Sequence, residues 1–379
     1  MKLTTAGESH GKALVAIIEG LPAHLKIDID KINKELALRQ SGYGRGGRQK
    51  IERDRAEILT GARNGETLGS PLTLCIYNKD FETWEACMSS GVCDESVMQQ
   101  KSLTKVRPGH ADLTGVLKFE QTDARNILER ASARETAIRV AAGGVYKQYL
   151  SALGVEIAGY VKEICGVKDQ GNYTFNELLR AKETDTGMLD LEAERLAKEK
   201  IDALKKDGDT AGGIVEIRVK GLKSGFGSVM TYAEKLDGQL AQGLMSIQAV
   251  KGVEIGAGFD VGKTSGKDVH DEIFYDESKG YYRETNRAGG IEGGMSNGEE
   301  IVVSVAMKPI PTLMKGLKTI DYTTKEKATA ASERSDVCAI FALEVIAESV
   351  VAQVLAGAIA KRLGGDTIRE IKERYERLP

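Results

Sequence analysis

The spacing of apolar and polar residues along the chain predicts a mixture of strands and helices. Short apolar runs typical of buried strands occur at residues 13–22, 155–164, 212–222 and 299–311. Two further apolar runs, separated by a turn region rich in Gly and Asn, predict a β-hairpin over residues 56–78. The first hundred residues are therefore expected to consist largely of short strands.

Apolar residues at helical spacing predict helices at residues 27–40, 133–153, 190–206 and 337–363. Asp30 is a candidate N-cap of the first of these helices, and Gly154 is expected to follow the end of the second. The last helix is the most apolar part of the chain, but Glu344 and Glu348 interrupt it. We therefore expect a buried core helix rather than a membrane span.

The order of these elements favours one fold class. Strands and helices come in clumps rather than in strict alternation, which favours an α+β fold over a doubly wound parallel sheet. The 379 residues would fit one large domain as well as two or three of average size. No linker, internal repeat or low-complexity tract divides them.

The composition is ordinary for a globular protein with a real core. Hydrophobic residues make up 41% of the chain, charged residues 29%, and the formal net charge is -3. Because non-specific nucleic-acid binding needs a broad positive field, any attraction for anions must be local. The five cysteines form no CxxC pair, so they indicate reduced thiols of a cytoplasmic enzyme rather than a zinc site. The N-terminus lacks the pattern of a signal peptide.

Two short motifs imitate nucleotide and RNA sites. Residues 257–264, AGFDVGKT, fit a relaxed P-loop pattern, but no amphipathic helix follows whose N-terminus would face a phosphate. The segment GRGGR at residues 44–48 resembles RGG segments that bind RNA, but those occur in disordered repeats and this is a single copy. We expect neither a P-loop nor RNA binding.

Local attraction for anions is concentrated between residues 36 and 55. This segment, LALRQSGYGRGGRQKIERDR, holds five arginines and four glycines. Arginines recur later, at Arg107, Arg130, Arg134, Arg139 and Arg334. A guanidinium group binds carboxylate or phosphate in a two-pronged geometry that lysine does not offer. The pattern indicates a small ligand that carries several anionic groups.

Candidate proton-handling residues accompany the arginines. His10 in AGESHG and His110 in RPGHAD lie among small residues that let a ligand approach closely. Each is by itself equally well explained as a structural turn histidine, but two of them beside an arginine cluster indicate acid–base chemistry. Asp336, near Arg334, is equally well explained as an N-cap of the last helix.

A helix N-terminus is predicted beside one of the arginines. Ser132 and Glu135 have the spacing of a capping box. The free N–H groups of such a terminus, with the guanidinium of Arg134 beside them, would form a seat for a phosphate group.

Eight segments, in order and over nearly the whole chain, resemble the chorismate synthase family. They are GESHG (7–11), RQSGYGRGGRQKIERD (39–54), VRPGHAD (106–112), RASARETAIRVAAG (130–143), SIQAVKGVEIGAGF (246–259), AGGIEGGMSNG (288–298), MKPIPT (307–312) and ERSD (333–336). The resemblance implies a single domain over residues 1–379, with helices sandwiched between antiparallel sheets, and a homotetramer. It implies a 1,4-anti elimination of phosphate from 5-enolpyruvylshikimate-3-phosphate, which gives chorismate and depends on reduced FMN without net redox change.

The resemblance also implies roles for individual residues. Substrate anions would be bound by Arg39, Arg48, Arg107 and Arg134, and NADPH by Arg39 and Arg45. FMN would contact Arg130, Ala131, Ser132, Gln248, Ala249, Gly293, Lys308, Pro309, Ile310, Pro311, Thr312 and Arg334. Protons would be handled by His10 at the flavin, His110 at the departing phosphate and Asp336 near the central nitrogen of the flavin. Ala131 and Gln248 stand where the family commonly has serine and asparagine, which bears on how FMN is held.

Two other functions share some of these features. A flavin-dependent reductase of an anionic molecule would use the same flavin and arginines but would consume one pyridine nucleotide per turnover. An RNA-binding module would lose affinity steeply with salt and would not depend on flavin. No metal, nucleic-acid or membrane partner is expected. The sequence leaves open whether the chain reduces its own FMN with NADPH.

Overall fold

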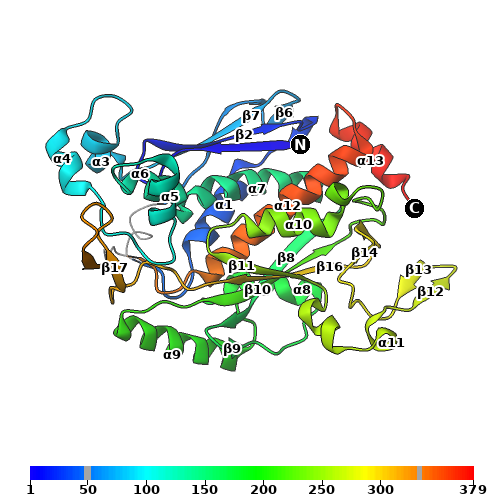
Figure 1. The fold of residues 1–379 in the computed structure, drawn as a ribbon. Coiled ribbons are helices and arrows are strands. Elements are labelled where there is room, and N and C mark those ends of the chain that lie inside the picture. Colours follow the sequence, from blue (N-terminus) through cyan, green and yellow to red (C-terminus); the bar gives the residue numbers. More distant parts are fainter. Residues whose placement is uncertain (47–52, 331–334) are drawn as a thin grey trace.

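Two large antiparallel sheets enclose a layer of helices in the part of the chain that the computed structural model describes, residues 1–46, 53–330 and 335–379 (Figure 1). Neighbouring strands in both sheets pair antiparallel, and the helices between them contact both sheets. The predicted α+β class, with helices packed between antiparallel sheets, is confirmed.

The first sheet has the strand order β1–β2–β7–β4. Its strands are β1 (Lys2–Ala6), β2 (Ala13–Glu19), β7 (Leu72–Tyr77) and β4 (Glu57–Thr60). In β2 the alternate residues Leu14, Ala16 and Ile18 are fully buried, because successive side chains of a strand point to opposite faces. The sheet therefore has one face on the helices, and the predicted strand at residues 13–22 is confirmed, with its end at Glu19.

The predicted hairpin over residues 56–78 contains a second hairpin. β4 and β7 are its outer strands, and β5 (Ala62–Arg63) pairs with β6 (Glu66–Leu68) inside it. β6 also pairs with β3 (Ala23–Lys26), so the inner hairpin belongs to a separate sheet with the order β3–β6–β5. This pairing joins segments about forty residues apart in sequence, beyond the reach of a local pattern.

The second sheet has the order β11–β16–β10–β8–β9 and lies on the other side of the helices (Figure 1). Its strands are β11 (Val250–Ile255), β16 (Ile301–Met307), β10 (Gly213–Lys220), β8 (Glu156–Ile164) and β9 (Val167–Lys168). β8, β10 and β16 correspond to three of the predicted strands. Ile301, Val303 and Val305 of β16 are fully buried, which marks the face of the sheet that covers the core.

The helical layer consists of α1 (Ile29–Gln40), α7 (Thr136–Ser151), α10 (Leu236–Met245) and α12 (Ile340–Leu363). α7 contacts β2 and β7 of the first sheet, while α12 contacts β8 and β10 of the second, and the two helices pack on each other. At their crossing, a Cβ added to Gly143 would lie 2.2 Å from the Cβ of Ser349, so glycine allows the close approach. The apolar core extends through this layer from one sheet to the other.

α12 is the predicted core helix. By length and composition α12 could cross a membrane, but 83% of its most apolar stretch is buried inside the fold. The prediction from the sequence that α12 is the last helix of the chain is wrong. The short helix α13 (Ile368–Glu376) follows it and begins with a capping box made by Thr367 and Glu370.

The caps of the predicted helices differ in one respect from expectation. Asp28, not Asp30, caps α1, because its carboxylate accepts from the N–H groups of Asp30 at 3.0 Å and Lys31 at 3.4 Å. Asp30 is thus one of the capped donors. Gly154 has φ +77° shortly after α7, as predicted for a glycine that ends a helix.

Shorter elements surround the sandwich. Between β7 and α7 lie α3 (Phe81–Met88), α4 (Glu95–Lys101), α5 (Asp112–Phe119), α6 (Arg125–Ala131) and the 3₁₀ helix η1 (Ala133–Glu135). Between β9 and α10 lie α8 (Phe175–Leu178), η2 (Leu179–Glu183), the predicted amphipathic helix α9 (Leu191–Asp207) and η3 (Tyr232–Glu234). After β11 come η4 (Gly258–Lys263), α11 (Gly266–Val269) and the hairpins β12 (Ile273–Asp276)–β13 (Gly280–Arg283), β14 (Ile291–Glu292)–β15 (Met295–Ser296) and β17 (Lys318–Ile320)–β18 (Lys327–Thr329). The P-loop-like segment forms the exposed η4, and only the four-residue α11 follows, so it lacks the helix that a P-loop needs.

A cluster of charges is buried inside the helical layer. The carboxylate of Glu348 accepts from Lys182 at 2.6 Å and from Lys147, which also binds Glu35 at 2.6 Å. Burial by itself would raise the pKa of Glu348, but the two ammonium groups lower it to about 2. Burial and the neighbouring Glu348 raise the pKa of Glu344, whose side chain is therefore held protonated.

Replacing Glu348 and replacing Glu344 by glutamine should affect the stability of the fold differently. We expect Glu348→Gln to lower the free energy of unfolding by about 3–5 kcal/mol, because it leaves buried ammonium groups without their carboxylate. Glu344→Gln should change it by less than about 1 kcal/mol, because it replaces one neutral side chain by another of the same shape. Chemical denaturation at a fixed protein concentration measures both values. Equal losses for the two variants would contradict the assignment of the proton to Glu344.

Candidate active site

His10, in the loop between β1 and β2, is held from two directions. The carboxylate of Glu129, in α6, accepts from the backbone N–H of His10 at 2.8 Å and lies 2.9 Å from Nδ1 of its ring. The ring of Trp84, in α3, stacks on the imidazole with 4.1 Å between centroids. Burial alone would raise the pKa of Glu129, but its contacts with His10 and Arg125 lower it, so an ionised carboxylate faces His10.

His110 lies in a similar arrangement built from a different segment. Its Nδ1 contacts Oδ1 of Asp112, the first residue of α5, whose side chain is fully buried. Arg107 binds the same carboxylate with two prongs, Nε to Oδ2 at 2.8 Å and Nη2 to Oδ1 at 3.0 Å. Arg107 is 6% exposed, so this ion pair is largely shielded from water.

The segment at residues 308–312, which follows β16, lies against this turn. Nζ of Lys308 donates to the carbonyl of Gly109, and Oγ1 of Thr312 accepts from Nη1 of Arg107 at 3.0 Å. The carbonyl of Thr312 in turn accepts from Oγ of Ser335 at 2.7 Å. The predicted cofactor segment is thereby joined to His110 on one side and to the residue before Asp336 on the other.

Asp336 is an ion-pair partner and does not cap a helix. Its Oδ1 accepts from the N–H of Gly46 at 2.6 Å, and its Oδ2 lies 3.2 Å from Nη1 of Arg45. α12 begins later, at Ile340, and its N-cap position is Ala339. Arg45 and Gly46, of the segment predicted to bind anions, therefore lie against the stretch before α12 that carries Asp336.

Arg39 and Arg134 share one buried acid. Asp54 lies 2.6 Å from Nη1 of Arg134 and 3.8 Å from Nη1 of Arg39. Arg39 also donates to Oγ1 of Thr136 at 2.9 Å, and Arg134 to Oδ1 of Asn78 at 2.8 Å. Burial, together with the charges of nearby arginines, lowers the pKa of Arg39. The two guanidinium groups lie at the start of α7, as the arginine pattern suggested, but buried in the protein rather than on a solvated face.

These groups form a network of two parts. In the first part Asn78, which accepts from Arg134, donates to the carbonyls of Glu8 at 3.2 Å and Gly11 at 2.7 Å, on either side of His10. Arg134 and Arg39 share Asp54 in the same part. In the second part Arg45 pairs with Asp336, and Ser335 and Thr312 lead from there to Arg107 and His110. The two parts approach each other at Arg39 and Arg45, whose like charges influence each other.

The predicted capping box does not form. Oγ of Ser132 accepts from the N–H of Arg134 at 3.2 Å and caps η1 rather than α7. Oε1 of Glu135 instead accepts from Oγ1 of Thr5 at 2.7 Å. Its other oxygen, Oε2, accepts from Nε2 of Gln248 at 3.2 Å. Glu135 is therefore used in tertiary contacts, which is why it does not reach back to the N–H group that a capping box needs.

Gln248 and Ala249 have two features that would suit a bound ligand. Oε1 of Gln248 is buried and has no hydrogen-bond partner among the described residues. Ala249 has φ +68°, a left-handed conformation that is strained for a residue with a Cβ. Its carbonyl accepts from the N–H of Lys308 at 3.0 Å. Oε1 of Gln248 could accept a hydrogen bond from a ring that carries N–H groups, such as a flavin. The strained backbone of Ala249 and the 308–312 segment lie beside it.

The other residues predicted to bind the cofactor do not all lie near Gln248 and Ala249. Arg130 and Ala131 end α6, where the exposed Arg130 lies 3.4 Å from Oγ1 of Thr5. Gly293 lies in the turn between β14 and β15, on the opposite side of the molecule from α3 and β17 (Figure 1). Within the described part of the chain, no hydrogen bond or ion pair joins it to the network above. Arg48 and Arg334 lie outside the described residues.

Some residues of the network were not singled out from the sequence. Asp54 and Asp112 lie inside two of the quoted motifs, beside the arginines that they bind, so their spacing carried a signal. Asn78 and Glu129 carried none, because only the fold brings them to Arg134 and His10. Trp84 is the one tryptophan of the chain, which marks it as unusual but does not place it.

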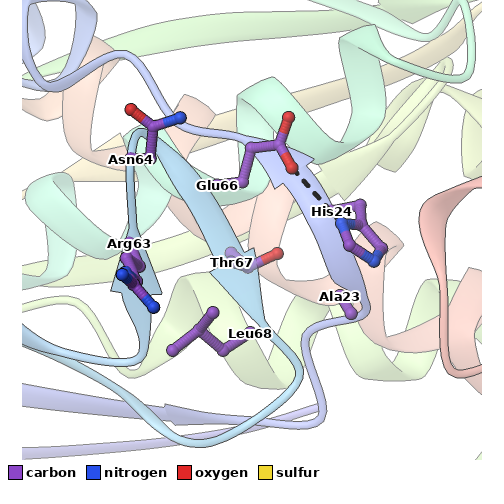
Figure 2. Close-up of a pocket in the computed structure, with 7 residues that line it drawn as sticks. All are labelled: Ala23, His24, Arg63, Asn64, Glu66, Thr67 and Leu68. Carbon is purple, nitrogen blue, oxygen red and sulfur yellow. Dashed lines mark hydrogen bonds and ion pairs between the residues drawn. The ribbon is translucent and has the colours of Figure 1, made fainter.

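A depression elsewhere on the surface has no part in this network. It is lined by Ala23, His24, Arg63, Asn64, Glu66, Thr67 and Leu68 of the β3–β6–β5 sheet (Figure 2). Nδ1 of His24 lies 3.3 Å from Oε2 of Glu66 in an exposed pair. His24 thus has the setting of a surface histidine.

Comparison with known proteins identifies this arrangement. The family model described as chorismate synthase matches residues 1–360. The chorismate synthase of Caldicellulosiruptor bescii is 51% identical over 382 residues, which cover 100% of this chain and 99% of that protein. The chorismate synthase of Geobacter sulfurreducens is also 51% identical, with 99% and 98% covered. A crystal structure of chorismate synthase superposes with a TM-score of 0.77 at 39% identity, covering 99% of this chain and 96% of that one.

The matching family is one of enzymes that eliminate phosphate from a small anion, which are carbon–oxygen lyases. The chain belongs to the chorismate synthase family. This confirms the resemblance carried by the eight sequence motifs. The activity of the chain is that of the family, the conversion of 5-enolpyruvylshikimate-3-phosphate to chorismate, for which the family uses reduced FMN.

Proposed function

We propose that this chain carries out the chorismate synthase reaction at the network that contains His10 and His110. The observation that supports this placement is the pairing of buried cations with carboxylates. Asp54 and Asp112 hold buried guanidinium groups, and each of the two histidines contacts a carboxylate. The substrate carries one phosphate and two carboxylates, so it needs several cationic groups within a short distance and a proton donor beside the phosphate.

Arg39, Arg48, Arg107 and Arg134 bind the anionic groups of the substrate. Asp54 lies between Arg39 and Arg134, and one carboxylate offsets only one of the two positive charges. The guanidinium groups of Arg39, Arg107 and Arg134 are fixed by protein contacts before the substrate arrives, so little reorganisation is needed on binding. A crowded polyanion is thereby held in one orientation.

The residues present fit a bound flavin. Gln248 offers a buried acceptor, Ala249 a strained backbone, and the segment from Lys308 to Thr312 a wall next to His110. Arg130, Ala131, Ser132 and Arg334 complete the set. Reduced FMN, when bound, supplies electron density that eases the departure of phosphate from the allylic carbon. The protein positions the reactants and handles the protons.

His110, His10 and Asp336 handle the protons. His110 donates a proton to the departing phosphate, a task that suits an imidazole because its unperturbed pKa of about 6.5 lies near neutrality. His10, between Glu129 and Trp84, favours the protonation state of the flavin. Asp336 contributes to the acceptance of the ring proton, for which it must exchange its contact with Arg45.

The chain acts as one catalytic domain over residues 1–379 and assembles as a cytoplasmic homotetramer. The apolar core that extends through both sheets supports the single domain. The position of Gly293, apart from the other predicted flavin residues, supports assembly, because another copy of the chain would bring this residue to the site. NADPH, as a reductant of FMN, binds at Arg39 and Arg45, which lie close enough to influence each other electrostatically.

Anaerobic release of phosphate tests the reaction and excludes the reductase. With photoreduced FMN and 5-enolpyruvylshikimate-3-phosphate, we expect many turnovers per flavin and no consumption of NADPH beyond that needed to keep the flavin reduced. The assay is run with and without NADPH. Phosphate release in strict proportion to NADPH oxidised would contradict elimination and support a reductase.

The arginine cluster should bind the substrate rather than merely raise the local charge. Arg48→Ala should weaken substrate binding by about 2–5 kcal/mol if the ion pair is desolvated. Arg55→Ala, in the same segment, should cost less than about 1 kcal/mol, since its side chain is 75% exposed. Calorimetric titration of the substrate in the presence of oxidised FMN gives both values. Similar affinities for the two variants would rule out a specific role for Arg48.

The proton-handling residues should affect turnover more than affinity. His110→Ala and Asp336→Asn should each lower the single-turnover rate by about 10–10⁴-fold, the usual range for the loss of a general acid or base. Flavin and substrate affinities should change much less. The rates are followed by flavin absorbance with prereduced FMN. A variant with a near-normal rate would remove its residue from the mechanism.

A further inference from the structure

The carboxylate of Asp112 is enclosed by donors. It is fully buried at the start of α5 and accepts from the backbone N–H of Arg107 at 3.1 Å and from Nε and Nη2 of the same residue. The remaining contact is with Nδ1 of His110. An acid that only closed a turn would not need a two-pronged guanidinium partner, whereas an acid that must stay charged in a buried position does.

The contacts determine which ring nitrogen of His110 carries hydrogen. Nδ1 lies near both Oδ1 of Asp112 and, at 3.1 Å, Nη2 of Arg107. A guanidinium group only donates and an ionised carboxylate only accepts, so Nδ1 cannot satisfy both. Burial alone would raise the pKa of Asp112, but its bonds to His110 and Arg107 hold it well below the usual range. Asp112 is thus ionised and accepts, and Nδ1 bears a hydrogen.

The ring is also held on the side of the 308–312 segment. Thr312 accepts from Nη1 of Arg107, and Lys308 donates to the carbonyl of Gly109, next to His110. Among the described residues, the charged groups that face the ring are Asp112 and Arg107 from its own turn and Lys308 from the neighbouring segment. Of these only Asp112 favours the positive imidazolium.

We propose that Asp112 is the positioning residue of His110: it fixes hydrogen at Nδ1, so that the proton exchanged with the substrate is carried by Nε2. The proposal rests on the proposed function, in which His110 protonates the departing phosphate. In that step the bond between Nε2 and hydrogen breaks and a phosphate O–H bond forms. The neutral imidazole that remains keeps its hydrogen at Nδ1, where Asp112 accepts it. Asp112 itself neither gains nor loses a proton.

Asp112→Asn tests the proposal because the amide would donate to Nδ1 of His110, where the carboxylate accepts from it. The amide oxygen would stay on Arg107, which can only donate, and its NH₂ group would then face Nδ1 of His110. Nδ1 must accept, which places the hydrogen of the neutral ring at Nε2. The loss of the negative charge also removes the carboxylate that stabilises the positively charged form of the ring. A carboxylate-to-amide change of this kind lowers turnover by about 10⁴-fold in a Ser-His-Asp triad, through the wrong tautomer.

The measurements use the full chain with prereduced FMN. We expect the single-turnover rate of Asp112→Asn to fall by about 10–10⁴-fold at neutral pH, with its alkaline limb moved to lower pH and part of the rate restored on acidification. The matched control is Asp321→Asn. Asp321 is also an aspartate that accepts several hydrogen bonds, from Thr104, Thr323 and Thr324, but it does not contact His110. Its rate and pH profile should match those of the unmodified chain.

The position of the hydrogen on His110 can also be measured in the unmodified chain, so this test does not depend on the folding of Asp112→Asn. The chain has four histidines, so ¹⁵N shifts of labelled histidine resolve each ring, and His110→Gln assigns one of them. We expect the neutral ring of His110 to carry hydrogen at Nδ1 in the unmodified chain. Hydrogen at Nε2, or an unchanged rate and pH profile in folded Asp112→Asn, would overturn the proposal.

The outcomes separate this proposal from the proposed function. A full rate in His110→Ala would remove the role of His110 itself, whatever Asp112 does. Loss of rate in His110→Ala with a normal rate in Asp112→Asn would overturn only the positioning role. An unmodified chain that releases no phosphate would contradict the proposed function.

Discussion

The packing of α12 against α7 determines where every part of the site lies. The two helices meet closely enough that Gly143 has no room for a Cβ beside Ser349, and each carries one of the sheets on its other side. The start of α7 holds the arginine pair, and the segment before α12 holds Asp336. A displacement of one helix against the other would therefore move the arginine pair relative to Asp336.

The second constraint on the site is that buried charges need partners. In four places a buried cation or a histidine is paired with a carboxylate. Arg107 is paired with Asp112, Arg134 with Asp54, Arg45 with Asp336, and His10 with Glu129. A buried guanidinium group without a partner would be strongly unfavourable, so each of these buried cations has an acid beside it. The acids fix the orientation of the cations. In the proposed site, substrate recognition and proton transfer would depend on carboxylates that do not themselves need to touch the substrate.

Much of the fold could be predicted from local patterns, and the exceptions have physical causes. Strands such as β2 and β10 and helices such as α9 and α12 were recognisable because one side of each is apolar at the correct period. The N-cap of α1 was misplaced by two residues because Asp28 and Asp30 are equally good caps in sequence. The box of Ser132 and Glu135 failed because Thr5 and Gln248, distant in sequence, compete for the glutamate.

The sequence by itself determined the family, the chemical types at the site and the presence of arginines for a polyanion, because these depend on which residues occur in which motif. The tertiary structure decided which acid accompanies which cation. Asn78, Glu129 and Trp84 reach His10 and Arg134 only through the folding of the β7–α7 region onto the first loop. The separation of Gly293 was also decided there. Such pairings depend on distance in space, and a buried charge is stabilised by whichever partner the packing brings near, not by its neighbours in sequence.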